Sequence, residues 1–327
     1  MPQLITHHIF GMDVLKKLNN SITKNFDTEK DIYEMFCQSF DNFLYYMNFN
    51  PFKCKKVRFI SKKGHRSNVK KYFVNIINNI KKLGLENDEQ ALAYLYGSIN
   101  HYVLDSTCHP FIFYKTGYYN KKKKKETKKY MGLHGDMESN IDAFFYINRY
   151  KKSYHKVNVT KEFIPKVKFT NNLKLIMDET FINTFNEKNA SKYYINSYNS
   201  SRILYKLFIN DKFGLKKFIF KIHDKINIFK PNKFQYYTTY IKQPNLKYLN
   251  IEHKKWCYPS DKNIVSNESF IDLYNKAIDR SVNLITLAHD VINNKKDIKE
   301  FEKEIGNLSY TRGLDCDNSK PLKYYEF

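Results

Sequence analysis

The chain has 327 residues and a formal net charge of +23, from 56 lysines and arginines against 33 aspartates and glutamates. Apolar residues make up 42% of it, enough for a sizeable core, and no run of about 20 apolar residues suggests a membrane-spanning helix. The positive charge would attract nucleic acid, anionic lipid or phosphate esters, but abundant Lys, Asn, Ile, Tyr and Phe are also typical of an AT-rich genome. Charge by itself therefore selects no partner.

The cysteines and the N-terminal residues indicate a reducing compartment. The five cysteines are odd in number and dispersed, without a C-x-x-C pair, which argues against a disulfide framework. The first residues, MPQLITHH, lack the basic-then-apolar pattern of a secretory signal. We therefore expect a cytoplasmic protein. Peripheral contact with an anionic membrane stays open, and nothing indicates the oligomeric state.

The first half of the chain has the apolar spacing of amphipathic helices. Apolar residues recur every three or four positions over residues 10–18, 69–83 and 134–150. Asp88 is a good N-cap for a further helix that carries residues up to 109. Pro110 disfavours helical geometry at the residue before it, so we expect that helix to end at His109.

The second half is less regular. Helical spacing recurs in four segments, residues 173–185, 193–208, 215–228 and 270–292. Residues 231–259 are aromatic-rich and irregular, and the tail 307–327 has no helical period. The lysine-rich segment 115–129 is expected to be a solvated, mobile loop. These patterns predict one all-α domain over residues 1–327, with a metal-site half (about 1–165) and a helical C-terminal half (about 166–327); a split near residue 165 is the alternative.

Two helices of the first half carry histidine and carboxylate at four-residue steps. His101, Asp105 and His109 form one such series, and His134 and Glu138 repeat the step. Four residues turn an α-helix about 40° past one full turn, so each series lies on one face of its helix. Imidazole and carboxylate are the nitrogen and oxygen ligands that zinc accepts. One such pair is often only a surface ion pair, but two together predict a multinuclear metal site.

Other polar residues fall close to this pattern. Asp41 is an acid among apolar neighbours (QSFDNFLYY), where an unpaired carboxylate would be costly to bury, so it requires a cation or hydrogen bonds. His7 and His65 lie near helix ends. His8 is expected to be a neighbour of the site rather than a ligand, and Asp136 and Asp142 are expected to be solvated.

In order along the chain, these motifs resemble the zinc-dependent phospholipase C family, which is related to zinc-dependent single-strand nucleases. The resemblance is carried by residues 6–11 (THHIFG), Asp41, residues 64–65 (GH), residues 94–110 (YLYGSINHYVLDSTCHP) and residues 134–138 (HGDME). The family's usual Gly-Pro before the aspartate is Ser-Phe here. Weaker likeness continues through residues 249–256 and 309–314, so it extends over most of the chain.

The resemblance implies a helical fold with metal ligands on core helices and a site of two to three zinc ions. Asp41, His65, His101 and Asp105 would hold one zinc. A second would be held by His109, His134 and Glu138. Asp105 would bridge the first zinc to a third, which His7 would also bind.

In the family the third zinc also binds the amino group and carbonyl oxygen of the N-terminal residue. Pro2 follows the initiator methionine directly, and small second residues generally permit removal of that methionine. We hypothesise that the prolyl amine and carbonyl of Pro2 complete the third site.

The function implied is a zinc-dependent phosphodiesterase, of phospholipase C type, with phospholipid or another phosphodiester as substrate. Asp41 and Asp105 are the candidate catalytic residues, since they would orient water as well as hold metal. In choline-preferring relatives an aromatic residue follows the early aspartate, and Asn42 here weakens the case for phosphatidylcholine. Two alternatives stay open: a single-strand nuclease, with nucleic acid as substrate, and a non-catalytic zinc protein that associates with anionic membranes.

Overall fold

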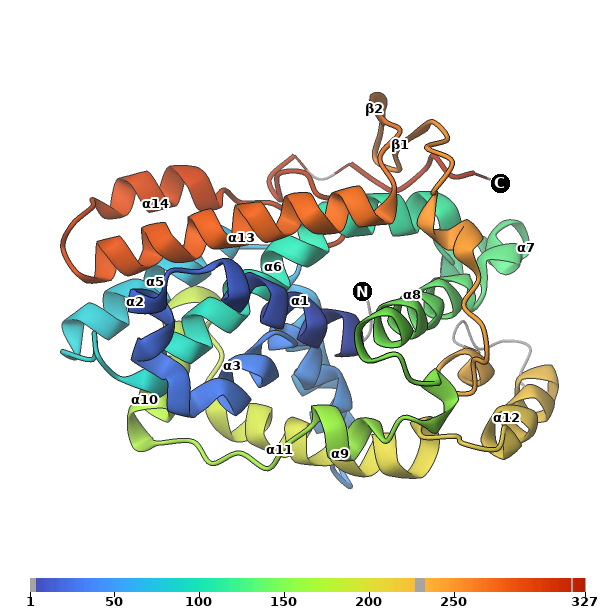
Figure 1. Cartoon of the computed structure of the whole chain (residues 1–327), viewed down its shortest axis with the longest axis horizontal. Helices are drawn as coiled ribbons and strands as arrows, with labels where there is room; N and C mark the ends of the chain where they lie inside the picture. The colour runs from blue at the N-terminus through green and yellow to red at the C-terminus, as the bar shows by residue number, and fades with distance from the viewer. Residues whose placement is uncertain (1–3, 227–232, 319, 327) are drawn as a thin grey trace.

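Helices form nearly all of the regular structure in the computed structural model, which describes residues 4–226, 233–318 and 320–326 (Figure 1). Those residues contain fourteen α-helices, several short 3-10 turns, one π-helical turn and a two-stranded hairpin. The predicted all-α fold is confirmed. None of the described helices is both long and apolar enough to cross a membrane.

The α-helices, in chain order, are α1 (Leu4–Lys17), α2 (Asn20–Thr23), α3 (Lys30–Phe36), α4 (Pro51–Gly64), α5 (Val69–Lys82), α6 (Glu89–Thr116), α7 (Lys124–Thr127), α8 (Leu133–Tyr150), α9 (Val159–Phe163), α10 (Asn171–Phe185), α11 (Ala190–Leu204), α12 (Leu215–Ile226), α13 (Phe270–Ile292) and α14 (Ile298–Ile305). The shorter turns are η1 (Lys24–Glu29), η2 (Ser39–Tyr45), η3 (Lys121–Lys123), η4 (Lys128–Tyr130), η5 (Tyr154–Lys156), η6 (Tyr205–Ile209), η7 (Phe234–Tyr236) and η8 (Leu246–Leu249). The hairpin pairs β1 (Trp256–Tyr258) antiparallel with β2 (Asp261–Ser266).

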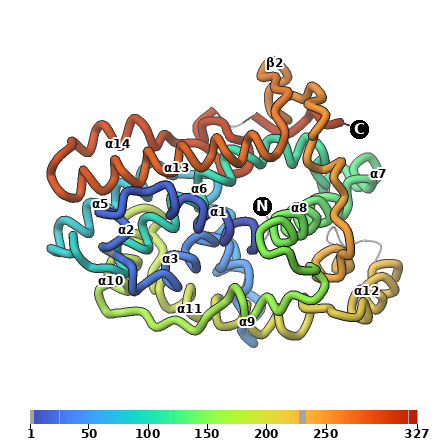
Figure 2. The backbone as a smooth tube through the Cα atoms, viewed as in Figure 1, coloured from blue at the N-terminus to red at the C-terminus, as the bar shows by residue number. Residues whose placement is uncertain are grey.

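Helix α6 is the central element of the fold. Its N-terminus is capped as predicted, because the Asp88 side chain accepts a hydrogen bond from the Ala91 amide at 2.9 Å. The helix is buried over most of its length and packs against α1, α3, α8 and α13. In Figure 2, α13 and α14 run along one long edge of the molecule and α9 and α11 along the other.

The predicted end of this helix at His109 is wrong, since α6 continues through Pro110 to Thr116. A proline inside a helix costs about 3 kcal/mol, because it removes one hydrogen bond and crowds the preceding turn. Here the tail covers the break: Gly313, at φ +63°, packs so closely that a Cβ there would lie 2.5 Å from the Ser106 carbonyl oxygen. Packing on all sides of α6 outweighs the local preference.

Close approach of α3 to α6 depends on a second glycine. A Cβ at Gly97 would lie 2.5 Å from the Tyr33 carbonyl oxygen, so any larger residue would push the two helices apart. Since η2 follows α3 directly, this contact sets how near the side chain of Asp41 comes to α6.

Most of the other predicted helices agree with the structure to within a few residues. Helix α13 has the predicted bounds and begins with a capping box between Ser269 and Asp272. Helix α1 begins six residues before the predicted start, which places His7 on a helix rather than ahead of one. The last two residues of the segment predicted at 215–228 lie outside the described residues.

Two irregular segments differ from expectation. The lysine-rich segment 115–129 is not a continuous loop, because α6 extends into it and η3, α7 and most of η4 follow, although Lys122–Lys125 are exposed as expected. The region 231–259 contains η7, η8 and β1, and the hairpin was not predicted from the sequence. Trp256 explains the hairpin: it is buried, stacks on Tyr258 and contacts Phe111 of α6. In the described part of the tail there is no helix, as predicted.

One cluster of buried apolar side chains runs from Ile5 to Cys316 and draws on both halves of the chain. The proposed division into a metal-site half and a C-terminal half stays a prediction.

Candidate metal centre

Eight of the nine predicted ligands come together in the structure, from five separate segments. His7 lies on α1, Asp41 on η2 and His65 directly after α4; the remaining five are on α6 and α8, and are His101, Asp105, His109, His134 and Glu138. The ninth, Pro2, lies outside the described residues.

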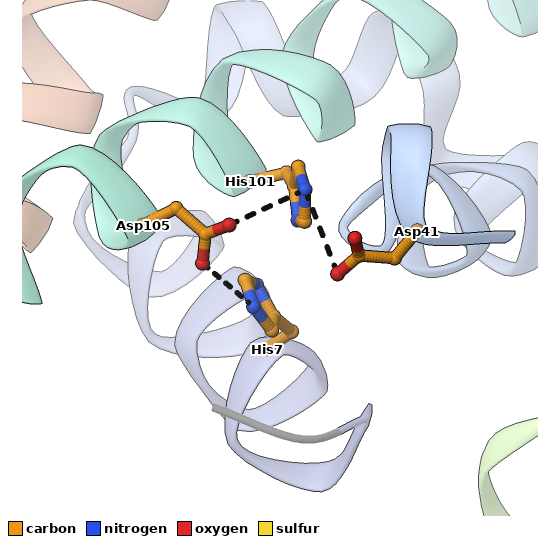
Figure 3. Close-up of side chains that lie close together, drawn as sticks. All are labelled: His7, Asp41, His101 and Asp105. Carbon is orange, nitrogen blue, oxygen red and sulfur yellow. Dashed lines mark ion pairs between the residues drawn. The ribbon is translucent and has the colours of Figure 1, made fainter. Parts of the chain in front are cut away.

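The first group consists of His7, Asp41, His101 and Asp105 (Figure 3). One potential ligand atom from each lies within 4.8 Å of the others, and none of the four residues is more than 1% exposed. The Nε2 atom of His7 is 3.2 Å from Asp105 Oδ1, and His101 Nε2 is 3.6 Å from Asp105 Oδ2 and 3.8 Å from Asp41 Oδ2. These spacings leave room for cations between the side chains.

His65 borders the same group. Its Nε2 atom lies 3.1 Å from Asp41 Oδ1, 3.4 Å from His101 Nε2 and 3.7 Å from Asp105 Oδ2. The four residues that the resemblance assigned to one zinc are thus neighbours, with His7 on the Asp105 side.

The second group consists of His109, His134 and Glu138, whose ligand atoms also lie within 4.8 Å of one another. Glu138 Oε1 is 2.8 Å from His134 Nε2 and 3.8 Å from His109 Nε2. The two groups are adjacent, because His109 Nδ1 is 3.8 Å from Asp105 Oδ2. Asp105 is therefore in contact with both.

Backbone carbonyls orient three of the imidazoles. The Nδ1 atom of His65 lies 2.6 Å from the Ser61 carbonyl, that of His101 lies 3.1 Å from Cys37, and that of His109 lies 2.7 Å from Tyr310. A carbonyl only accepts, so each Nδ1 carries the proton and each Nε2 presents a lone pair to the centre. This is the arrangement that metal-binding histidines adopt.

Burial favours neutral imidazole at most of these positions. Loss of solvent lowers the pKa of His7 to about 3 and holds the pKa values of His101, His109 and His134 well below the ordinary value. At His65 the nearby Asp41 and Asp105 outweigh burial and raise the pKa. Neutral imidazole is the form that binds metal, so most of these histidines do not have to lose a proton before a metal ion binds.

The carboxylates behave differently from each other. Burial raises the pKa of Asp105 well above its usual range, with Asp41 adding to the shift. At Asp41 burial acts in the same direction, but His101 and His65 outweigh it and lower the pKa. Both ring nitrogens of His7 and all four carboxylate oxygens of Asp41 and Asp105 are buried without a well-directed hydrogen bond from the described residues. Orphaned polar atoms of this kind are costly, and bound cations would satisfy them; the residues present therefore fit zinc.

Asp142 is a structural residue of the site that the sequence prediction placed wrongly in solvent. It is 1% exposed and accepts hydrogen bonds from the amides of Ile5 and Thr6, at 3.1 and 2.9 Å, and from the Thr6 hydroxyl. Burial raises its pKa to about 7, although these bonds act against the shift. Asp142 lies four residues after Glu138, so the same helical step that identified the ligands also indicated its inward direction.

Replacing Asp142 by alanine should therefore loosen α1 and the histidine it carries. Two first-turn amides of α1 would lose their acceptor, and we expect the free energy of unfolding to fall by about 2 kcal/mol. Urea unfolding of chelator-treated protein measures this without a contribution from metal. Asp136 lies on the same helix, is half-buried, and accepts from the Tyr248 hydroxyl at 2.7 Å and, more weakly, from the Asn140 amide at 3.4 Å; Asp136→Ala should cost about 1 kcal/mol. Equal losses in the two variants would contradict an anchoring role for Asp142.

The remaining polar neighbours do not face the centre. His8 contacts Glu34 at 3.2 Å, as expected for a residue beside the site. The Asn42 amide donates to the Tyr194 hydroxyl at 2.7 Å and is buried. Asn42 therefore acts as a packing residue of η2.

A cavity of about 800 Å³ opens beside the second group. His134 and Glu138 line it together with apolar side chains, among them Leu44, Leu204, Phe208 and Phe220. Its wall also contains polar side chains, among them Arg58 and the hydrogen-bonded pair Tyr45 and Tyr205. A substrate in this cavity would have one end at the histidine–carboxylate group and the rest in an apolar channel.

The helical bundle buries histidines and carboxylates in two adjoining groups, each of which could hold a metal ion. A family model described as zinc dependent phospholipase C matches residues 6–199, which is more than half of the chain and includes the eight predicted ligands in the described residues. The chain belongs to this family, and zinc dependence comes with it. No curated protein and no solved structure matches the chain.

Proposed function

We propose that the protein is a zinc-dependent phosphodiester hydrolase that cleaves phospholipids in the manner of a phospholipase C. The observation that carries this proposal is the apolar cavity that reaches His134 and Glu138, the ligands at the edge of the buried cluster. Family membership supports the zinc chemistry, and the cavity supports a lipid as the substrate.

The eight proposed ligands among the described residues are neighbours in the structure. Asp41, His65, His101 and Asp105 would hold one zinc, and His109, His134 and Glu138 would hold the second. His7 and Asp105 would hold a third, and Pro2, which lies outside the described residues, is its further proposed ligand. Asp105 Oδ1 lies 3.2 Å from His7 Nε2 and Asp105 Oδ2 lies 3.6 Å from His101 Nε2, which supports a bridging role for Asp105 between the first and third zinc.

Zinc in such a site would lower the pKa of a bound water molecule and place positive charge beside the phosphoryl oxygens. The protein's own residues would position the metal ligands, the water and the substrate. The Nδ1–H donors of His65, His101 and His109 fix the imidazole rings, and Asp41 and Asp105 place negative charge where water must be oriented and deprotonated. The cavity walls exclude bulk water from the rest of the substrate.

A single-strand nuclease would use the same chemistry, but its binding groove would differ. Single-stranded nucleic acid binds grooves in which cations follow the backbone and aromatic faces stack on bases. The cavity beside Glu138 is lined by aliphatic, phenylalanine and tyrosine side chains, with Arg58 as its only Lys or Arg side chain in the described residues. One such cation does not form a row that follows a phosphate backbone, and this favours a lipid over nucleic acid as the substrate.

A purely structural zinc protein is the third candidate. Structural zinc sites are closed by four protein ligands. The second group offers three side chains, and His134 is 29% exposed toward the cavity. This access supports a catalytic site.

The test is zinc analysis of untagged protein, followed by an assay on mixed phospholipids. We expect about two to three zinc ions per chain, fewer in both His101→Ala and Glu138→Ala, and release of water-soluble phosphate ester that falls with metal content. Cleavage of single-stranded DNA without lipid hydrolysis would establish the nuclease instead. Absence of metal from protein purified without chelator would overturn the assignment.

A further inference from the structure

Helix α12 presents an apolar face to solvent. Five side chains spaced three or four residues apart are each between 48% and 75% exposed, namely Leu215, Phe218, Ile219, Ile222 and Ile226. A surface helix of a globular protein normally turns such a stripe toward the core. Figure 1 shows α12 at the periphery of the molecule, apart from the main bundle.

The opposite face of α12 forms part of the cavity wall. Phe220 points inward and contacts the rings of Phe208 and Phe234, and His223 also packs on Phe234. All four of these residues line the cavity beside Glu138. Helix α12 therefore lies between the cavity and the solvent, with one face toward each.

A second exposed apolar ridge lies next to the cavity. It comprises Met47 and Phe49, just before α4, and Phe52 and Phe59 on α4, with exposures from 50% to full. A surface hollow of about 650 Å³ is lined by Phe49 and Phe59 of this ridge and shares Leu44 and Arg58 with the cavity wall. We call the α12 stripe and this ridge together the docking rim.

The charge beside the rim is positive. Lys212, Lys221 and Lys225 are exposed on or next to α12, and its one acid, Asp224, is buried and accepts from the Gln235 amide. Helix α4 contains lysines and an arginine but no acid. An apolar stripe bordered by lysines is the pattern of helices that lie in the interface of anionic membranes.

We propose that the docking rim binds the surface of an anionic lipid bilayer and inserts its apolar side chains among the lipids. This inference rests on the proposed function for its purpose, since lipid bound at the ridge would lie beside Leu44 and Arg58, which also line the cavity. The apolar rim, its lysines and its continuity with the cavity together favour a membrane.

The test is sedimentation of the full chain with lipid vesicles. Phe218→Ser/Ile222→Ser should raise the lipid concentration for half-binding to vesicles of phosphatidylcholine and phosphatidylserine by about tenfold or more. The matched control is Leu175→Ser/Ile182→Ser, which removes two exposed apolar side chains from α10 and should bind as the unmodified protein does. Neither pair is buried, so both variants should fold.

Charge is tested with a second pair of variants. Lys221→Glu/Lys225→Glu should weaken binding to the anionic vesicles and leave weak binding to pure phosphatidylcholine unchanged. Lys70→Glu/Lys71→Glu, exposed on α5, changes the net charge equally and should have a smaller effect. Equal loss of vesicle binding in both variants would mean that only net charge matters, and would overturn the proposal that the docking rim binds the membrane.

Two further outcomes separate this inference from the proposed function. If the α12 variant binds vesicles normally but changes the oligomeric state in solution, the stripe is an interface between copies and the membrane proposal fails. The α12 variant should retain hydrolysis of a short-chain phospholipid dissolved below its micelle concentration. If the unmodified protein binds vesicles through the rim but hydrolyses no lipid, membrane docking is supported and the proposed phospholipase activity is overturned.

Discussion

Replacing Asp105 by asparagine is expected to lower phospholipid hydrolysis by about a thousandfold or more, because one charge is removed from between the two ligand groups. Asparagine keeps the size of the side chain and one oxygen but cannot neutralise two cations. Asp105 contacts His7, His101 and His65 within 3.7 Å and His109 at 3.8 Å, so no other carboxylate of the centre has as many histidine neighbours. The measurements are kcat on lipid and zinc content of the same preparation.

The stability of metal-free protein distinguishes a lost ligand from a damaged fold. Burial raises the pKa of Asp105, so its charged form is disfavoured in the empty site, and Asp105→Asn should cost metal-free protein little or stabilise it. The same variant should be less stable than the unmodified protein when zinc is present. Asp178→Asn, which removes an acceptor for Ser191 outside the centre, serves as the control and should keep its zinc and its kcat. Strong destabilisation of metal-free Asp105→Asn would mean that Asp105 acts in folding rather than in metal binding.

The ligands on α6 and α8 could be predicted from the sequence because their spacing is a property of the helix itself. Residues four apart share a face in any α-helix, so His101, Asp105 and His109 needed no knowledge of the fold. Asp41, His7 and His65 could be placed only through the family resemblance. Their closeness to Asp105 depends on how α1, η2 and α4 pack, as at the contact that Gly97 permits with α3.

The failures of prediction share one physical cause, which is that tertiary packing overrode a local preference. Helix α6 passes through Pro110 because the tail and the neighbouring helices enclose it. Asp142 is buried because the amides at the start of α1 need an acceptor, and those amides are 136 and 137 residues away in sequence. The hairpin forms around buried Trp256, in a segment whose aromatic residues gave no regular alternation. None of these partners is visible in a local window of sequence.

Removal of zinc by a chelator is expected to lower the Tm of the full chain by roughly 10 °C, because metal that binds only the folded state stabilises it. In this protein the effect has a local cause. Without cations, the buried oxygens of Asp41 and Asp105 and the ring nitrogens of His7 have no well-directed partner in the described residues. Thermal unfolding monitored by circular dichroism, with and without chelator, measures the shift.

The shift between the two conditions matters, rather than either Tm alone. His101→Ala opens a cavity and has its own lower Tm, but with fewer metals to lose it should respond to chelator by about half as much or less. Phe218→Ser/Ile222→Ser, on the exposed stripe of α12, should respond as fully as the unmodified protein, because it leaves the ligands untouched. If chelator left the unmodified protein unchanged, or shifted His101→Ala equally, the buried cluster would owe its stability to protons and packing, and zinc would not be what holds it together.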